Sequence, residues 1–271
     1  MRTLLLLSAL ALVACDGSTT PDAGARDGAA FDDATLDGGP LDGGASDAGA
    51  EDAAPGDAGP PQSPIGAITG ACGALDDELT SDSPHWLEQT ATYPDGWNLA
   101  MEDALSEGAR EILADGTAGG SSGYSEAFAF ELLHRCEGAT LVASETEIEY
   151  TTEGSLTDVL VEIDGAPIGV SVTRAVSITG ACTREDGYSA TRATELLTDK
   201  LDGVNESSRN VDPAFAWVKQ ILFVHADTPT AAAALRDAWD GLDADLRADT
   251  VVFVSVSEAM DGFLYFEDRC P

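Results

Sequence analysis

Basic residues are scarce in this chain. It contains 13 lysines and arginines against 49 aspartates and glutamates, and the formal net charge is −36. Proteins that bind nucleic acid neutralise its phosphates with lysine and arginine, so this composition argues against a nucleic-acid partner. A surface this negative also disfavours direct contact with anionic lipid headgroups. The acidic balance therefore indicates a protein that is kept soluble by its charge.

Long apolar runs are lacking as well. The stretch at residues 4–14 is shorter than the ~20 residues that cross a bilayer. It follows Met1 and Arg2 and ends in Leu-Val-Ala-Cys at Cys15. This arrangement resembles the lipobox of bacterial lipoprotein signal peptides. The resemblance implies that residues 1–14 are a signal peptide, that cleavage falls before Cys15, and that Cys15 carries lipid. The alternative is an ordinary secretory signal followed by a chance cysteine.

The lipobox resemblance places the protein in the bacterial cell envelope, periplasmic or surface-exposed, with its lipid as the contact to the membrane. Residues 15–63 then form a linker rich in aspartate, alanine and glycine. Residues 16–63 hold ten aspartates and one glutamate against one arginine, a net charge of −10. With so few bulky apolar residues, the segment cannot offset its ordering entropy, so we expect a disordered tether. A calcium-binding acidic repeat is the alternative, but the spacing is irregular.

Closely spaced cysteine pairs are absent, which argues against a zinc site. Four cysteines fall in residues 64–271: Cys72, Cys136, Cys182 and Cys270. An exported chain meets oxidising conditions, so two disulfides are expected, and the sequence leaves their connectivity open.

Residues 64–271 have the length of one domain and carry a net charge of −27. Apolar periodicity predicts an irregular lead-in over residues 64–98 and a helix from Leu99 that Gly116 stops. The further elements are a helix at 125–135, strands at 139–150, 158–163 and 168–173, a helix ending near Gly203, a strand at 219–225, a helix from Thr228, a strand at 251–256 and a final strand at 263–266. This order predicts an α/β fold. Its mixed central sheet combines a three-stranded antiparallel meander with parallel crossover strands, and helices flank it.

The order of elements between residues 121 and 257 resembles the core of the PD-(D/E)XK, or restriction-endonuclease-like, superfamily. The resemblance implies an acidic residue on the first helix, an aspartate at the head of the second strand and a Glu-x-Lys motif on the third. In the superfamily the carboxylates hold magnesium at the scissile phosphate. Here Glu131 takes the helix position, with Glu126 as an alternate, and Asp158 takes the second.

The third strand departs from this pattern, because Ser171 and Thr173 stand where Glu and Lys are expected. Arg174 points to the opposite face of the strand, so it does not replace the lysine. The leading hypothesis is therefore a non-catalytic domain without a cofactor. The alternative is a magnesium-dependent phosphodiesterase that uses Glu131, Asp158 and the Val172 carbonyl, with Glu162 as a further ligand.

A serine hydrolase is a third hypothesis. Residues 119–123 match Gly-x-Ser-x-Gly around Ser121, and His225 follows later in the chain. However, that motif requires a strand before the serine, whereas a helix is expected here.

Overall fold

The computed structural model describes residues 63–93, 99–118, 122–179, 183–185 and 187–266. The chain divides into two units, Met1–Ala54 and Pro55–Pro271, and all described residues belong to the second. The expected signal peptide, Cys15 and all but the last residue of the expected linker lie outside the described residues. Within the described part, no helix is both long and apolar enough to cross a membrane.

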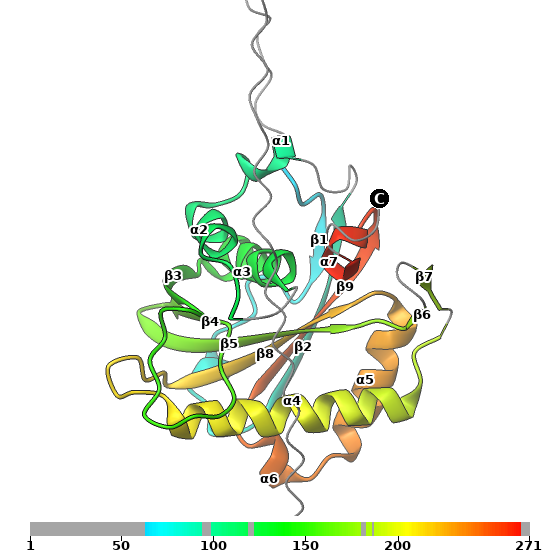
Figure 1. The fold of residues 1–271 in the computed structure, drawn as a ribbon. Coiled ribbons are helices and arrows are strands. Elements are labelled where there is room, and N and C mark those ends of the chain that lie inside the picture. Colours follow the sequence, from blue (N-terminus) through cyan, green and yellow to red (C-terminus); the bar gives the residue numbers. More distant parts are fainter. Residues whose placement is uncertain (1–62, 94–98, 119–121, 180–182, 186, 267–271) are drawn as a thin grey trace, which may run out of the picture. The chain divides into compact units, whose positions relative to one another are not determined.

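A seven-stranded mixed sheet forms the centre of the domain, in the order β1-β2-β9-β8-β5-β4-β3 (Figure 1). Strands β2, β9, β8 and β5 run parallel, whereas β1 pairs antiparallel with β2, and β5, β4 and β3 form an antiparallel meander. The strands are β1 Ile68–Gly70, β2 His85–Tyr93, β3 Thr140–Ser144, β4 Val159–Ile163, β5 Ala166–Ala175, β8 Lys219–Ala226 and β9 Val251–Ala259. A small separate hairpin joins β6 Ile178–Thr179 to β7 Thr183–Arg184.

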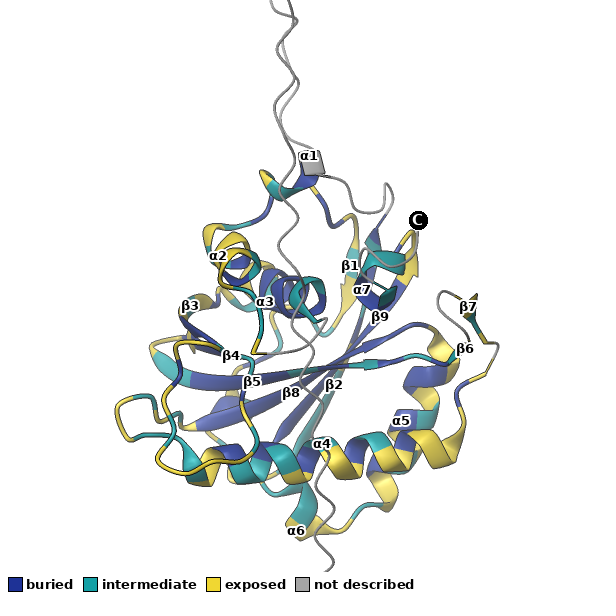
Figure 2. Cartoon of the chain, in the orientation of Figure 1, coloured by how far each residue is buried: buried dark blue, intermediate teal, exposed yellow. Residues whose placement is uncertain are grey.

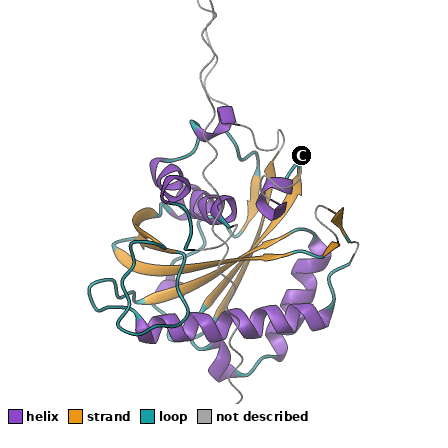
Figure 3. Cartoon of the chain, in the orientation of Figure 1, coloured by secondary structure: helices purple, strands orange, loops and turns teal. Residues whose placement is uncertain are grey.

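Helices cover both faces of the sheet (Figure 3). They are α1 Leu99–Glu102, α2 Glu107–Asp115, α3 Gly123–Glu137, α4 Ala190–Asn210, α5 Pro229–Gly241, α6 Ala244–Arg247 and α7 Gly262–Phe266, and a short 3-10 helix spans Asp77–Leu79. One hydrophobic core lies between α2, α3, α7 and the sheet, and a second lies between the sheet, α4 and α5. Every residue of β8 is buried, as expected for a central parallel strand enclosed by helices (Figure 2).

The expected α/β class, the antiparallel meander and the parallel crossover strands are confirmed. Helix α3 and strands β4, β5, β8 and β9 fall where the periodicity predicts them.

The expected irregular lead-in is wrong, because it contains β2, a nine-residue strand paired along its length with β9. Polar residues such as Gln89, Thr90 and Thr92 dilute its apolar signal. Their main-chain groups find partners in the short strand β1 on one side and in β9, which is far away in the sequence, on the other.

Four element boundaries also differ from expectation. The helix from Leu99 is interrupted, and Ser106 caps a new helix by accepting a hydrogen bond from the Ala109 amide. The strand from residue 139 ends at Ser144, α4 continues past Gly203, and residues 263–266 belong to a helix rather than a strand. The break before α2 follows a local signal, because Ser106 is a typical helix-capping residue.

A disulfide joins Cys72, just after β1, to Cys136 at the end of α3, with a Cα–Cα distance of 4.7 Å. The Glu137 carboxylate reinforces this junction by accepting hydrogen bonds from the amides of Gly73, Ala74 and Leu75. Cys182 and Cys270, the other two cysteines of the expected disulfide pair, lie outside the described residues.

Candidate functional site

Three carboxylates from three separate segments meet beside the antiparallel half of the sheet. Glu126 is in the first turn of α3, Glu145 follows β3, and Asp158 precedes β4. Each offers one oxygen, and these oxygens lie within 4.8 Å of one another. Glu126 is buried, while Glu145 and Asp158 are half-buried. This grouping, here called the carboxylate cluster, is the arrangement of oxygens that a divalent cation requires.

Asp158 lies just before β4, and a main-chain amide of the neighbouring strand β5 holds its side chain in place. Strand β4 starts at Val159, which lies opposite Val170 of β5, so the next part of β5 has no partner strand on that side. The Asp158 carboxylate accepts a hydrogen bond of 2.6 Å from the Val172 amide there. Asp158 therefore also has a structural role, because it accepts a hydrogen bond from a main-chain amide that has no partner strand on this side.

The electrostatics of Asp158 reflect its enclosure. Burial raises the pKa of its carboxyl well above the usual range, and the nearby Glu126 adds to the rise. The Val172 amide and the Lys200 ammonium oppose it by favouring the charged form. A buried and a half-buried carboxyl that repel one another in this way favour either a shared proton or a bound cation.

A cavity of about 420 Å³ opens beside the cluster. Its lining includes Glu145, Asp158 and Ser171 together with Lys200 from α4. Among the described residues of this lining, Lys200 is the sole cation. The cavity therefore combines carboxylates, a hydroxyl and one ammonium group.

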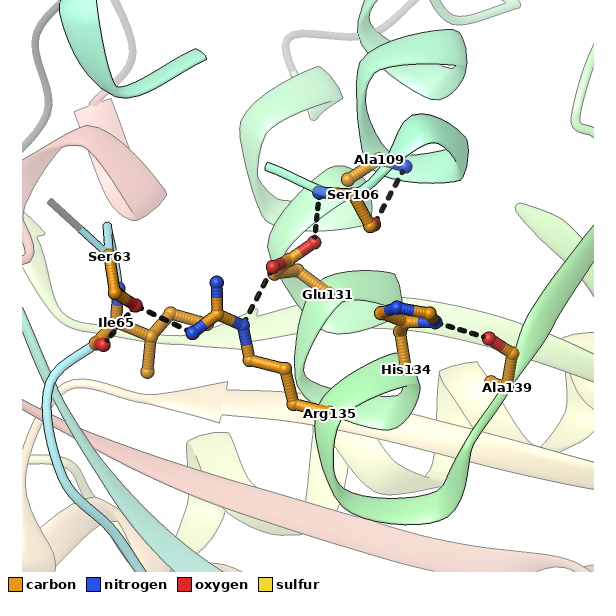
Figure 4. A network of polar contacts seen from close by, with 8 residues as sticks. All are labelled: Ser63, Ile65, Ser106, Ala109, Glu131, His134, Arg135 and Ala139. Atoms are coloured by element: carbon orange, nitrogen blue, oxygen red, sulfur yellow. Dashed lines mark hydrogen bonds and ion pairs between the residues drawn. The ribbon is translucent and has the colours of Figure 1, made fainter. Parts of the chain in front are cut away.

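Glu131, the expected helix ligand, does not belong to this cluster. Its carboxylate forms an ion pair of 2.7 Å with Arg135 and accepts a hydrogen bond of 2.9 Å from the Ser106 amide (Figure 4). Five positions separate it from Glu126, so the two side chains leave α3 in directions about 140° apart. Glu131 joins α2 to α3, and the alternate residue, Glu126, is the one that meets Asp158.

Ser171 and Thr173, which stand on β5 in place of the expected Glu and Lys, have different surroundings. Ser171 lines the cavity, whereas Thr173 is not among its lining residues, although both are largely buried. Glu162 is exposed on β4 and is not part of the carboxylate cluster. Of the four expected site residues, the structure thus brings Asp158 and Ser171 to one place.

The hydrolase hypothesis gains no support from His225. Its ring is fully buried in β8, and Nε2 makes a hydrogen bond of 2.8 Å with the Ser125 carbonyl. Burial lowers the pKa of this imidazole to about 4. The ring is enclosed between the sheet and α3, and Ser121 lies outside the described residues.

Two site residues escaped the sequence reasoning, namely Glu145 and Lys200. Glu145 was placed inside an expected strand, but β3 ends at Ser144 and Glu145 lies in the turn that follows. Lys200 is in the middle of α4, where an isolated basic residue has the pattern of a solvated helix surface. Glu145 drew no attention because the end of β3 at Ser144 is visible in the structure and not in the apolar pattern.

Comparisons with known proteins give limited information. No family model matches the chain. It is 37% identical over 153 residues to the AAC-rich mRNA clone AAC4 protein of Dictyostelium discoideum, a match that covers 56% of this chain but 22% of that protein. A solved structure of Pyrococcus furiosus SfsA in complex with Ca²⁺ aligns over 56% of this chain and 60% of its own, with 13% identity and a TM-score of 0.27.

Proposed function

We propose that this chain is an exported, lipid-anchored protein whose nuclease-like domain binds a divalent cation between Glu126, Glu145 and Asp158. The observation that carries the proposal is the approach of three carboxylate oxygens to within 4.8 Å of one another. Magnesium, manganese and calcium prefer carboxylate oxygens as ligands. Burial is the main cause of the raised pKa of Asp158, and a bound cation relieves the repulsion from Glu126 that adds to it.

The domain acts as a binding module rather than a nuclease in this proposal. Strand β5 provides Ser171 and Thr173, so it supplies neither a fourth carboxylate nor a lysine at the motif positions. The net charge of −27 over residues 64–271 repels polymeric phosphate backbones.

Cation binding is tested by titrating the purified protein with Mn²⁺ in a calorimeter. Wild type should bind about one equivalent, and Glu145→Gln and Asp158→Asn should each weaken binding by at least tenfold, because each removes a charged ligand. Asn retains an oxygen acceptor for the Val172 amide, so the local fold is preserved. Glu162→Gln, an exposed substitution outside the cluster, is the matched control. Unchanged binding in both cluster variants would refute the site.

The lipid anchor is tested separately by Cys15→Ser in the full chain. The residue implied by the lipobox resemblance is then unable to accept lipid. The variant should move from the membrane fraction to the soluble fraction of the cell envelope, whereas a Cys72→Ser variant that still folds should stay in the membrane fraction. Retention of Cys15→Ser in the membrane fraction contradicts the anchor.

A magnesium-dependent phosphodiesterase is the second candidate function, with Glu126 in the role first given to Glu131. The observation in its favour is that the carboxylate cluster borders a cavity rather than closed protein. A bound Mg²⁺ would polarise a phosphoryl oxygen and activate water. Cleavage of plasmid or single-stranded DNA in Mg²⁺ or Mn²⁺, abolished by Asp158→Asn, would establish this activity over the binding module.

A further inference from the structure

We infer that the groove between helix α2 and the outer edge of strand β3 binds an extended, lysine-containing segment of a partner protein. This α2–β3 groove shares no lining residue with the cavity of the proposed cation site, and the inference does not depend on that site. Three features of the groove carry it: an apolar floor, a row of carboxylates along one wall and an open strand edge along the other.

The groove has a volume of about 450 Å³ and a floor of apolar side chains. Phe130 of α3 and Leu141 of β3 line it, and the Phe130 ring stacks on the ring of His134 with 6.0 Å between the centroids. A Cβ on Gly108 of α2 would lie 2.6 Å from the Phe130 ring, so the glycine lets α2 lie directly against that ring. Packing therefore fixes the floor, which offers preformed apolar surface to an aliphatic chain.

Carboxylates follow the wall that α2 provides. Glu107, Glu111 and Asp115 are exposed and recur every fourth residue, so they share one side of the helix. Glu107 and Glu111 line the groove, and Glu111 also offers an oxygen within 4.8 Å of one from Asp115 and one from Glu147. Arg110, the one basic residue of α2, donates to a main-chain carbonyl outside the helix. The described lining of the groove contains neither lysine nor arginine, so the groove attracts cations.

An apolar floor below a rim of carboxylates matches the lysine side chain. The aliphatic stem of a lysine buries against apolar surface, while its ammonium group stays at the polar rim. Like charges four residues apart also weaken a helix, so a bound ammonium relieves repulsion along α2. The groove therefore suits lysine better than a purely apolar ligand.

The spacing of the carboxylates indicates that the ligand is extended. Residues four apart in a helix are separated by about 6 Å along its axis, and alternate residues of an extended chain are separated by roughly 6.6 Å. Lysines at every second position of an extended segment can therefore meet Glu107 and Glu111 in succession.

The strand that forms the other wall has an open edge. Strand β3 is the last strand of the sheet and pairs with β4 alone among the described strands, next to α2 (Figure 1). Its C-terminal end is closed, because the Ser144 amide donates to the Glu147 carboxylate and the Ser144 carbonyl accepts from the Glu147 and Ile148 amides. Thr140–Val142 has no such cover in the described part of the chain, and Val142 is 53% exposed. An extended segment of a partner can pair with an edge of this kind.

Electrostatics favours a basic partner over a second copy of this chain. Residues 64–271 carry a net charge of −27, so two copies repel one another, whereas a basic segment is drawn to the groove.

Calorimetry of the full chain tests the inference with an acetylated and amidated peptide in which lysines alternate with valines, since valine favours an extended chain. Wild type should bind this peptide, and added salt should lower the affinity, because it screens exposed charges. The double variant Glu107→Gln, Glu111→Gln should bind about tenfold more weakly or worse. The matched control, Glu195→Gln with Asp237→Asn, removes the same charge from exposed positions on α4 and α5 and should keep the wild-type affinity.

Equal affinities of wild type and the double variant overturn the inference, and so does a lack of binding to wild type. A peptide with glutamine in place of each lysine should not bind, and binding as tight as that of the lysine peptide contradicts the role of charge. Sedimentation of the chain alone covers the remaining occupant. A dimer that dissociates when both glutamates are replaced would place a second copy in the groove and overturn the inference as well.

Discussion

His225 should make the protein sensitive to acid in a way that a single substitution reveals. Its ring is fully buried, and its Nε2 atom bonds to the Ser125 carbonyl, one residue before Glu126 of the carboxylate cluster. Burial lowers the pKa of His225 from 6.5 to about 4, and Arg174 adds to the lowering, while the Ser125 carbonyl and Asp261 partly oppose it. The folded protein therefore keeps this ring neutral at pH values where the unfolded chain protonates it.

The magnitude follows from the two pKa values. The stability contributed by the neutral ring is fully present above pH 6.5 and is lost progressively as the pH falls toward about 4. The gap between these values corresponds to about 3 kcal/mol of unfolding free energy at its greatest. Other groups titrate in the same interval, so the wild-type curve alone does not isolate His225.

Denaturant unfolding of wild type and His225→Gln at pH 7, 5.5 and 4 isolates it. Glutamine can donate a hydrogen bond to the Ser125 carbonyl and does not titrate. The contribution of the carboxyl groups to the unfolding free energy therefore cancels when the two proteins are compared. Relative to the variant, wild type should lose about 3 kcal/mol between pH 7 and pH 4. A difference that stays constant over this interval refutes the assignment.

Three further predictions concern the disulfides and Asp158. Replacing Cys72 and Cys136 together by serine removes a cross-link between residues 64 positions apart, so unfolding free energy should fall by about 4 kcal/mol, measured by denaturant titration under oxidising conditions. Burial raises the pKa of Asp158, so the folded protein favours the protonated carboxyl and becomes less stable as the pH rises. In thermal scans without cation, Asp158→Asn should therefore have a higher melting temperature than wild type at pH 8. The difference in melting temperature should shrink toward pH 4. Non-reducing peptide mapping should join Cys182 to Cys270, and free thiols at both positions would contradict this pairing.

The sequence predicted the elements whose signal is local. Helix α3 and strands β5, β8 and β9 have clear apolar periodicity, and their bounds were approximately correct. Strand β2 was missed because what makes it a strand is its pairing with β9, a contact that no local pattern encodes. Helix α7 was misassigned as a strand because five residues are too few for apolar periodicity to distinguish a helix from a strand.

The candidate site was predicted in part for a similar reason. Asp158 and Ser171 were found through the superfamily resemblance, which implies a site residue at the head of the second strand and a motif on the third. To choose between Glu126 and Glu131, one must know which side of α3 faces Asp158. The packing of α3 against the sheet determines this, and the sequence does not show it. Lys200 could not be found, because its relation to Asp158 is set by how α4 lies across the sheet (Figure 1).

The place of β2 between β1 and β9 has a consequence for how the molecule assembles. Gln89 and Ser255, which face one another across these strands, are 166 positions apart. A chain that is synthesised from its N-terminus exposes β2 long before β9 is made. Completion of the sheet must therefore wait for β9, and such distant pairing slows folding and leaves strand edges open to aggregation. Folding should accordingly depend on protection of β2 until synthesis has delivered β9.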